Sequence, residues 1–337
     1  MKKTKFTPLW CIFCLIFFIS GCTMLGKQAP EWEEGSFTPD GKYYVYLYNI
    51  YDVSYYSQQG GMTHRSGTWD YYLQIIDCAT QKPLLNNPIR FKEHPFIGDI
   101  SNNYIWFNIR GVEKKNGVAI FDFAQGKLKY SAQDLQKINP HIPFGHGYFY
   151  KRPEASEIAI YQADDGREYI INPNTGVFQL AKRSYQEIIS SFFNSSTNLV
   201  HSIPGLTSQA FSGTRVKFQK GSDATITTAD DFLNPKFLSQ STNKQKPTTI
   251  YYRDYFFILS QTTRDNHSDL ILSMVDQNSL QTAWKIYLAE DKEKEISNSA
   301  ENYRFYQKED KLWVANQSYF KLIDLKSGQL ISQTALY

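Results

Sequence analysis

The chain has 337 residues, of which 36 are Lys or Arg and 33 are Asp or Glu. Three lysines (Lys2, Lys3 and Lys5) precede Cys22 and no acid does, so the chain from Cys22 onward carries 33 basic and 33 acidic residues. A net charge of zero gives no positive surplus for binding nucleic acid or anionic lipid. A hydrophobic fraction of 42% and an aromatic fraction of 16% exclude a disordered chain.

The first 22 residues have the composition expected of a targeting segment. Lys2, Lys3 and Lys5 precede an apolar run over residues 9–19, which at 11 residues is too short to span a bilayer. The sequence Ile-Ser-Gly-Cys follows at residues 19–22 and resembles the lipobox of bacterial lipoproteins. The resemblance implies that a signal peptide of residues 1–21 is removed and that Cys22 is lipidated and becomes the N-terminus. An ordinary signal peptide, or an uncleaved anchor with an accidental Cys, is the alternative.

The residue types at this site suit lipid attachment. Small residues at positions 20 and 21 fit a peptidase cleft, and a thiol is the nucleophile that lipid transfer needs. Two or more acyl chains anchor a protein stably. Thr23, and not an Asp, follows Cys22, and this pattern resembles that of lipoproteins forwarded to the outer membrane. We therefore expect a lipid-anchored protein of the bacterial cell envelope, at the outer membrane and facing the periplasm.

Residues 22–36 follow as a predicted flexible tether with a reach of about 20 Å. Beyond it, Cys78 is the one cysteine that is neither in the signal peptide nor lipidated, so no internal disulfide is expected. Cys78 is predicted to be a buried residue at a strand end, and a reactive thiol is the alternative.

Short apolar and aromatic runs punctuated by Gly and Pro predict an all-β body from residue 37 onward. Helical periodicity is rare and is expected only over residues 132–138 and 184–194. The predicted strands cover residues 43–48, 71–76, 104–109, 118–123, 147–150, 158–162, 168–171, 249–260, 270–275, 311–315 and 319–323.

One local pattern recurs five times along the body: an apolar strand, an Asp or Asn, three residues, and often Gly. A side-chain oxygen at the strand end can accept from backbone N–H groups two residues on, and Gly supplies a positive φ. The pattern therefore predicts turn caps rather than catalytic acids, although Gly is replaced at Gln81 and Leu280. The cap positions are Asp77, Asp122, Asn172, Asp276 and Asp324.

The caps are 45, 50, 104 and 48 residues apart, so a degenerate copy is expected within residues 215–239. A period near 45–50 residues with about four strands fits a β-propeller blade. We predict about six blades. A seventh blade and a pair of β-sandwich domains are the alternatives. The predicted units are 37–91, 97–134, 144–183, 201–240, 249–290 and 300–336.

Short motifs resemble known propeller repeats. The stretch 37–47 resembles the strand opening of periplasmic Tol-associated propellers. The hairpins at 275–286 and 323–331 resemble those of quinoprotein-type propellers and of the outer-membrane assembly lipoprotein with that fold. Trp stands at the repeat end only at Trp284, so the resemblance implies no quinone cofactor.

Candidate chemical sites are few. His141 and His146 lie five residues apart in a predicted loop and could share a metal, but no third ligand is close in sequence. Asp164 and Asp165 precede Gly166 in a predicted tight turn, and Asp230 precedes a second one. The sequence has no zincin, nucleophile-elbow, phosphate-loop or dinucleotide-binding motif. We therefore predict no catalytic residue, no cofactor and no bound metal.

Seven tyrosines lie within residues 43–56, before a polar stretch containing Gly60 and Gly61. They predict an aromatic strand pair that bulges at the two glycines, or an exposed aromatic loop suited to protein or glycan contact.

The sequence as a whole favours a membrane-anchored, non-catalytic module that binds or scaffolds a protein partner. The alternatives are a hydrolase or lyase with its site at the channel mouth, and a small-ligand or metal sensor.

Overall fold

The structure, a computed structural model, describes residues 26–59, 62–111, 116–150, 159–182, 206–210, 215–220, 226–228, 230–240, 248–262, 270–288 and 303–336. The signal peptide, Cys22 and the helix expected at 184–194 lie outside these ranges. Within them the chain is almost entirely antiparallel β-structure, as predicted. No helix of this part of the chain is long and apolar enough to cross a membrane.

The first sheet is built around a very long hairpin. β3 and β4 pair along their whole described length, and the shorter strands line their outer edges. Tyr, Val, Leu and Ile side chains of this sheet are buried against the second sheet on one face and the last sheet on the other. The strands are β1 (Gly26–Lys27), β2 (Glu31–Phe37), β3 (Tyr43–Gln59), β4 (Met62–Asp77), β5 (Lys82–Pro83) and β6 (Ile89–Phe91).

The beginning of the chain differs from the expectation. Residues 22–36 were predicted to be a flexible tether, but β1 and β2 within this span both pair with β3. Trp32 packs against the aromatic cluster of the first and last sheets. Strand β2 was not predicted because it contains three glutamates, and acidic residues are rare in strands.

The second and third sheets are four-stranded meanders, as expected. Between them lies helix α2 (Ala132–Ile138), where the sequence predicted it. Ser131 caps this helix and Asp134 completes a capping box. The strands are β7 (His94–Ile100), β8 (Tyr104–Arg110), β9 (Gly117–Asp122), β10 (Lys127–Tyr130), β11 (Tyr148–Tyr150), β12 (Ala159–Gln162), β13 (Glu168–Ile171) and β14 (Phe178–Leu180).

The fourth sheet has eight strands and corrects the expected division into separate blades. β18 pairs with β22, so the predicted units 201–240 and 249–290 form one continuous sheet. The register shifts between Leu233 and Lys236, where Pro235 cannot donate to the ladder. The strands are β15 (Leu206–Ala210), β16 (Arg215–Lys220), β17 (Ile226–Thr227), β18 (Phe232–Phe237), β21 (Tyr251–Tyr252), β22 (Tyr255–Gln261), β23 (Leu270–Asp276) and β24 (Thr282–Tyr287).

Two further details of this region can be compared with the predictions from the sequence. The run predicted as one strand over 249–260 is broken by a turn in which Arg253 has a φ of 56°. β16, β17 and β18 confirm that strands occupy the degenerate copy expected within 215–239. β19 (Ser239–Gln240) and β20 (Thr248–Thr249) form a separate small ladder.

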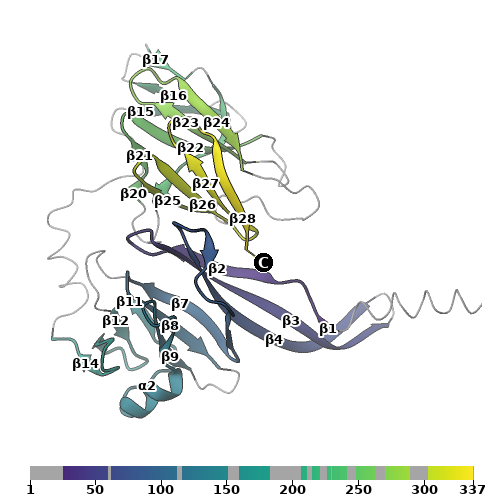
Figure 1. The fold of residues 1–337 in the computed structure, drawn as a ribbon, viewed down its shortest axis with the longest axis vertical. Coiled ribbons are helices and arrows are strands. Elements are labelled where there is room, and N and C mark those ends of the chain that lie inside the picture. The colour runs from purple at the N-terminus through teal and green to yellow at the C-terminus, as the bar shows by residue number, and fades with distance from the viewer. Residues whose placement is uncertain are drawn as a thin grey trace, which may run out of the picture.

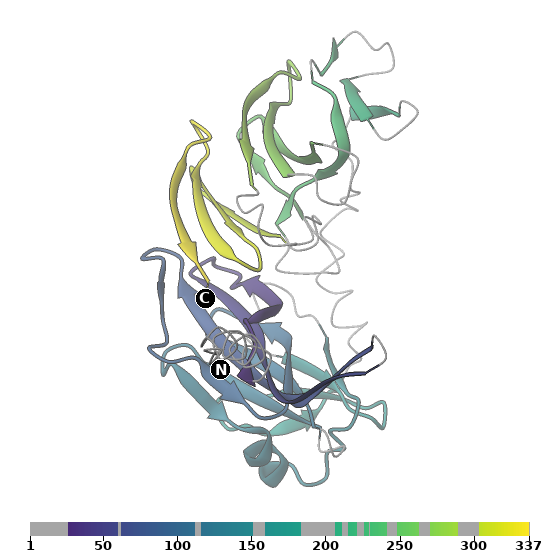
Figure 2. The same cartoon turned by 90° about the vertical axis from the view of Figure 1, so that its right-hand side faces the viewer.

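The fifth sheet is a four-stranded meander that joins the end of the chain to its beginning. It shares one core cluster with the fourth sheet and another with the first. Figures 1 and 2 show it lying between them. Its strands are β25 (Arg304–Lys308), β26 (Lys311–Ala315), β27 (Tyr319–Asp324) and β28 (Leu330–Ala335).

The sheets pack in the order third, second, first, fifth and fourth. This is the order of blades around a ring, except for the contact between the third and fourth sheets. No core cluster of the described residues joins the third sheet to the fourth, and the ring predicted from the sequence is not closed there (Figure 1).

Candidate functional site

The five recurring turns have the geometry that the sequence predicted. At each, the backbone N–H four residues after the cap donates to the cap's carbonyl, at 2.7–2.9 Å. The cap side chain accepts from backbone N–H groups within the turn, for example from Ser279 to Asp276 at 2.7 Å. These acids are therefore turn caps, as predicted.

The fourth position after each cap has a positive φ even where Gly is absent. Gly126, Gly176 and Gly328 have φ of 61–70°, and Gln81 and Leu280 both have 56°. The turn thus imposes the left-handed conformation on a glutamine and a leucine, at a cost of about 1–2 kcal/mol each. Leu280 is fully buried, and Gln81 hydrogen-bonds across to Ser332.

The eighth position after four of the five caps contacts the fourth position of the next sheet's turn. Leu85 lies beside Gly126, Tyr130 beside Gly176, and Trp284 against Gly328. Ser332 of the fifth sheet accepts from Gln81 of the first, so the relation continues from the end of the chain to its beginning. We call each such pair a joint.

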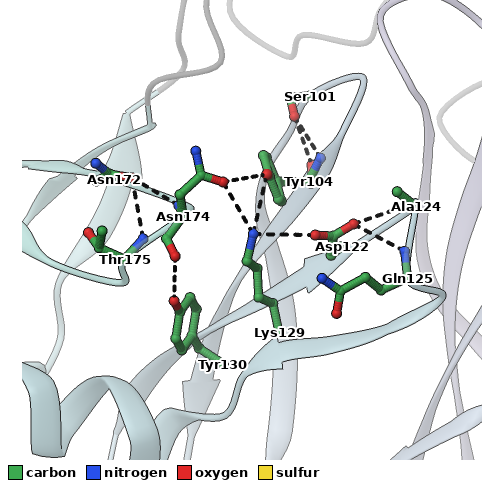
Figure 3. A network of polar contacts seen from close by, with 10 residues as sticks. All are labelled: Ser101, Tyr104, Asp122, Ala124, Gln125, Lys129, Tyr130, Asn172, Asn174 and Thr175. Atoms are coloured by element: carbon green, nitrogen blue, oxygen red, sulfur yellow. Dashed lines mark hydrogen bonds and ion pairs between the residues drawn. The ribbon is translucent and has the colours of Figure 1, made fainter.

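The joint between the second and third sheets carries a polar network (Figure 3). Tyr130 donates to the carbonyl of Asn174 at 2.7 Å, and Tyr104 donates to the Asn174 side chain at 3.2 Å. Lys129 Nζ lies 3.4 Å from Asp122 Oδ2 and 3.3 Å from Asn174 Oδ1. Burial would lower the pKa of Lys129, but its bonds to Tyr104 and Asp122 raise it, so the ammonium form is favoured.

A second polar cluster lies where the first strands of the sheets converge. β2 contacts both β7 and β25, and β7 contacts β11. Glu33 of β2 accepts from the Asn49 amide, and its other oxygen lies 3.8 Å from His94 Nε2. His94 of β7 stacks on Tyr71 with ring centroids 4.3 Å apart. We call Glu33, Asn49, His94, Trp32 and Arg304 the inner-strand cluster.

Arg304 and a neighbouring glutamate tie this cluster to the backbone. Arg304 Nε donates to the Gly35 carbonyl at 3.0 Å, and its guanidinium lies 5.6 Å from the centre of the Trp32 ring. Glu34 accepts from the Ile97 N–H. The inner-strand cluster therefore links the first, second and fifth sheets.

Burial lowers the pKa of His94, the nearby Arg110 lowers it further, and Glu33 opposes both. Trp32 Nε1, Asn49 Oδ1 and His94 Nε2 are buried without a hydrogen-bond partner among the described residues. The cluster thus has spare donors and acceptors with which to bind water or a small polar group.

The residues singled out in the sequence are not brought together here. His141 and His146 are exposed, and no group of three or more metal-ligating side chains occurs in the part of the chain that the structure describes. Asp164 accepts from the His146 N–H, and Gly166 has a φ of 77° in the predicted tight turn. Asp230 pairs with Lys285 at 2.7 Å.

Cys78 is buried at the end of β4, as predicted, and burial raises the pKa of its thiol. It is therefore not the alternative reactive thiol, because the nucleophilic thiolate is disfavoured. The tyrosines of 43–56 lie in the β3–β4 strand pair. The bulge predicted at Gly60 and Gly61 lies outside the described residues, and a bulge within them falls between Val53 and Tyr55.

The inner-strand cluster was not predicted from the sequence. Glu33 and Glu34 lay within the predicted tether, and His94 was a lone histidine between predicted strands. Trp32 and Glu33 are apolar and charged in turn, as neighbouring residues of a half-buried strand are. This signal is too short to predict a strand without knowledge of its partner.

The fold and the joints define a class: an all-β protein of antiparallel sheets that pack in cyclic order through repeated turns. The sequence matches no family model and no curated protein.

Three solved structures show weak likeness. They are apo AztD from Citrobacter koseri, the dihydro-heme d1 dehydrogenase NirN in complex with DHE, and an uncharacterised protein of Listeria monocytogenes. All are 10% identical and are matched over 90% of this chain, and over 86%, 66% and 94% of their own chains respectively. Their TM-scores of 0.26, 0.24 and 0.25 are too low to carry an argument about fold or function.

Proposed function

We propose that this chain is a lipid-anchored, periplasm-facing lipoprotein whose body is a β-propeller acting as a non-catalytic binding or scaffold module. Cys22 is its lipidation site and the outer membrane its location. The observation that carries the proposal is the packing of the last sheet against the first. Sheets stacked in the order of the chain would leave these two at opposite ends of the stack, whereas a propeller makes them neighbours.

The joints support the closed ring. Four of them follow one rule, and one of the four runs from the fifth sheet to the first. By the same rule, Leu180, the eighth residue after Asn172 in the third sheet, would contact Leu280 in the turn of the fourth sheet. Leu180 is 60% exposed among the described residues, as expected for a joint whose partner is not in place.

The roles of the acidic residues support a non-catalytic module. The acids at the strand ends hold turns, and Glu33 and Glu34 bind groups of the chain itself. A general acid or base must instead reach a substrate proton.

Thiol labelling tests the closed ring. Leu180→Cys in native protein should resist a maleimide reagent because the fourth sheet covers it, whereas Ile331→Cys, exposed in the fifth sheet, should react quickly. The buried Cys78 adds little background in native protein. Equal labelling of the two variants would contradict the ring.

Acyl-chain labelling in cells tests the anchor. The protein should incorporate labelled fatty acid and fractionate with outer membranes, and Cys22→Ser should abolish both results. Cys78→Ser is the matched control and should leave incorporation unchanged. Labelling of the Cys22→Ser variant would overturn the lipidation site.

Site-specific photo-crosslinking in native membranes tests the binding role. A crosslinker at exposed Tyr148 or Tyr287 should give one defined adduct with a protein partner. Absence of any defined adduct from a series of exposed positions on all five sheets would count against a scaffold.

A further inference from the structure

The β3–β4 hairpin extends far beyond the sheet to which it belongs. β3 has 17 residues and β4 has 16, whereas no other described strand exceeds 7. β2 covers the outer edge of β3 only as far as Asn49, and β6 covers β4 only from Tyr71 onward. Residues 50–59 and 62–70 therefore project as a two-stranded arm (Figure 1).

The start of the described chain is bound to this arm. Gly26 pairs with Val53 and Lys27 with Asp52, and Val53 in turn pairs with Gly67. Gly26 lies four residues after Cys22. A chain of four residues spans at most about 14 Å when fully extended. Gly26 is therefore held within about 14 Å of the lipid-bearing residue, and the middle of the arm lies one strand away from Gly26.

This distance places the arm at the membrane surface. A bilayer has a hydrocarbon core about 30 Å thick within a total of about 40–45 Å, so each headgroup layer is roughly 5–8 Å deep. A lipidated Cys22 lies at the boundary of the hydrocarbon. Gly26, and with it the arm, then lies in the headgroup layer or directly above it.

The arm carries side chains that suit this position. Tyr51 and Trp69 face each other across the strands with ring centroids 4.5 Å apart, and Trp69 is 41% exposed. Tyr55 is 56% exposed beyond the bulge. Gly67 lets the two strands approach closely here, because a Cβ at this position would lie 2.1 Å from the Asp52 carbonyl oxygen and 3.0 Å from the Tyr51 ring. Tyr and Trp gather at membrane interfaces because each has an apolar ring and a polar tip.

We propose that the arm lies within the headgroup layer of the bilayer that holds the Cys22 lipid, so that Trp69 on one face of the arm and Tyr55 on the other both contact that layer. The inference rests on the proposed lipidation of Cys22. Its physical basis is aromatic partitioning rather than charge, since the chain from Cys22 onward carries no net charge. The arm fixes the orientation of the sheets relative to the membrane, so the body stands beside the bilayer at a set angle.

A fluorescent probe on the arm tests the proposal. The lipidated full-length Tyr55→Cys variant is labelled with an environment-sensitive dye and reconstituted into vesicles of phosphatidylethanolamine and phosphatidylglycerol. Gln179→Cys in β14 is the matched control, because β14 lies on the opposite side of the body from the arm (Figure 1). The dye should not react with Cys78, because the Cys78 side chain is buried and the pKa of its thiol is raised.

The dye at position 55 should show blue-shifted emission and should lose intensity when brominated lipids replace ordinary ones. The dye at position 179 should show neither effect. Equal emission and equal quenching at the two positions would overturn the proposal. A blue shift at 55 that appears only when a cell-envelope protein is added would also overturn it, since the arm would then bind a protein strand.

The mass of the N-terminal peptide and vesicle flotation separate this inference from the proposed function. An unlipidated Cys22 overturns both proposals. A lipidated protein that floats with vesicles, but whose position 55 is unquenched, overturns only the placement of the arm. Circular dichroism of both variants shows whether the labelled proteins are folded.

Discussion

Two kinds of contact hold neighbouring sheets together, and they differ in where the stabilising groups lie. At two of the joints between sheets of consecutive chain segments, an aromatic residue reaches the next turn: Tyr130 donates to the Asn174 carbonyl, and Trp284 Nε1 donates to the Leu325 carbonyl at 2.9 Å. At the seam between the fifth and first sheets, the corresponding residue is the small Ser332, and aromatic side chains of the shared core donate hydrogen bonds across the seam instead.

The seam core is aromatic and internally hydrogen-bonded. Trp313 Nε1 donates to the Cys78 carbonyl at 3.1 Å, and Tyr46 donates to the Leu336 carbonyl. Phe37, Tyr44 and Phe320 pack around them with ring centroids 4.9–6.1 Å apart. Segments far apart in sequence need this core because no short connection holds them together, and closing a long loop costs entropy.

The largest effect is expected from removing the centre of the seam. Trp313→Ala should lower the free energy of unfolding by about 3–5 kcal/mol, as for other buried tryptophans. Trp284→Ala at a joint should cost less, because Trp284 is only partly buried. Urea unfolding followed by far-UV circular dichroism measures both. A larger loss for Trp284→Ala would show that the joints hold the sheets more strongly than the seam does.

A methyl group at two equivalent turn positions separates backbone strain from packing at a joint. Gly126→Ala and Gly328→Ala both place a side chain at a positive φ, which costs about 1–2 kcal/mol. Only at position 328 would the new Cβ lie 2.6 Å from the Trp284 ring, whereas at 126 the nearest atom, on Leu85, is 3.9 Å away. Overpacking should add about 1–3 kcal/mol for Gly328→Ala.

Thermal and urea unfolding of the two glycine variants checks this difference. Trp284→Ala combined with Gly328→Ala is the control, and should remove the extra loss while keeping the strain. Equal losses for Gly126→Ala and Gly328→Ala would show that Trp284 moves away at no cost.

Single hydrogen bonds at a joint and at the seam should contribute similarly. Tyr130→Phe removes the bond to Asn174, and Ser332→Ala removes the bond from Gln81. Each should lower the free energy of unfolding by about 0.5–1.5 kcal/mol. A loss from Tyr130→Phe with none from Ser332→Ala would show that the seam depends on its aromatic core alone.

The smallest effect concerns the pH dependence contributed by His94. Its pKa in the folded protein is lowered, so the unfolded chain binds a proton more readily as the pH falls below about 6.5. Folding stability should therefore decrease from there toward more acidic pH, and His94→Gln should reduce that slope. Urea midpoints across this range measure it, with exposed His141→Gln as the control. An unchanged slope in His94→Gln would contradict the assignment.

Much of the local structure could be predicted from the sequence, because the deciding interactions lie within a few residues of one another. The turn caps are an example: Asp276 accepts from Asn278 and Ser279, two and three residues on. The helix at 132–138 is set by Ser131 and Asp134 in the same way. Even the left-handed conformation at Gln81 and Leu280 follows from the position of the caps, although neither residue is glycine.

The candidate site could not be predicted, because its residues meet only in the folded chain. Glu33 and His94 are 61 positions apart, and Arg304 reaches the carbonyl of Gly35 across 269 residues. The strand character of residues 31–37 depended on β3 as a partner, since the pairing of two strands decides what their side chains contact.

The sequence by itself determined an all-β chain with repeated capped turns and a lipoprotein-like N-terminal motif, since these depend on neighbouring residues. Only the tertiary structure decided that β18 and β22 join two predicted units into one sheet, that the last sheet packs on the first, and that Gly26 and Lys27 pair with the arm. These features depend on which strand edges and apolar faces meet, and local patterns of residues do not encode that choice.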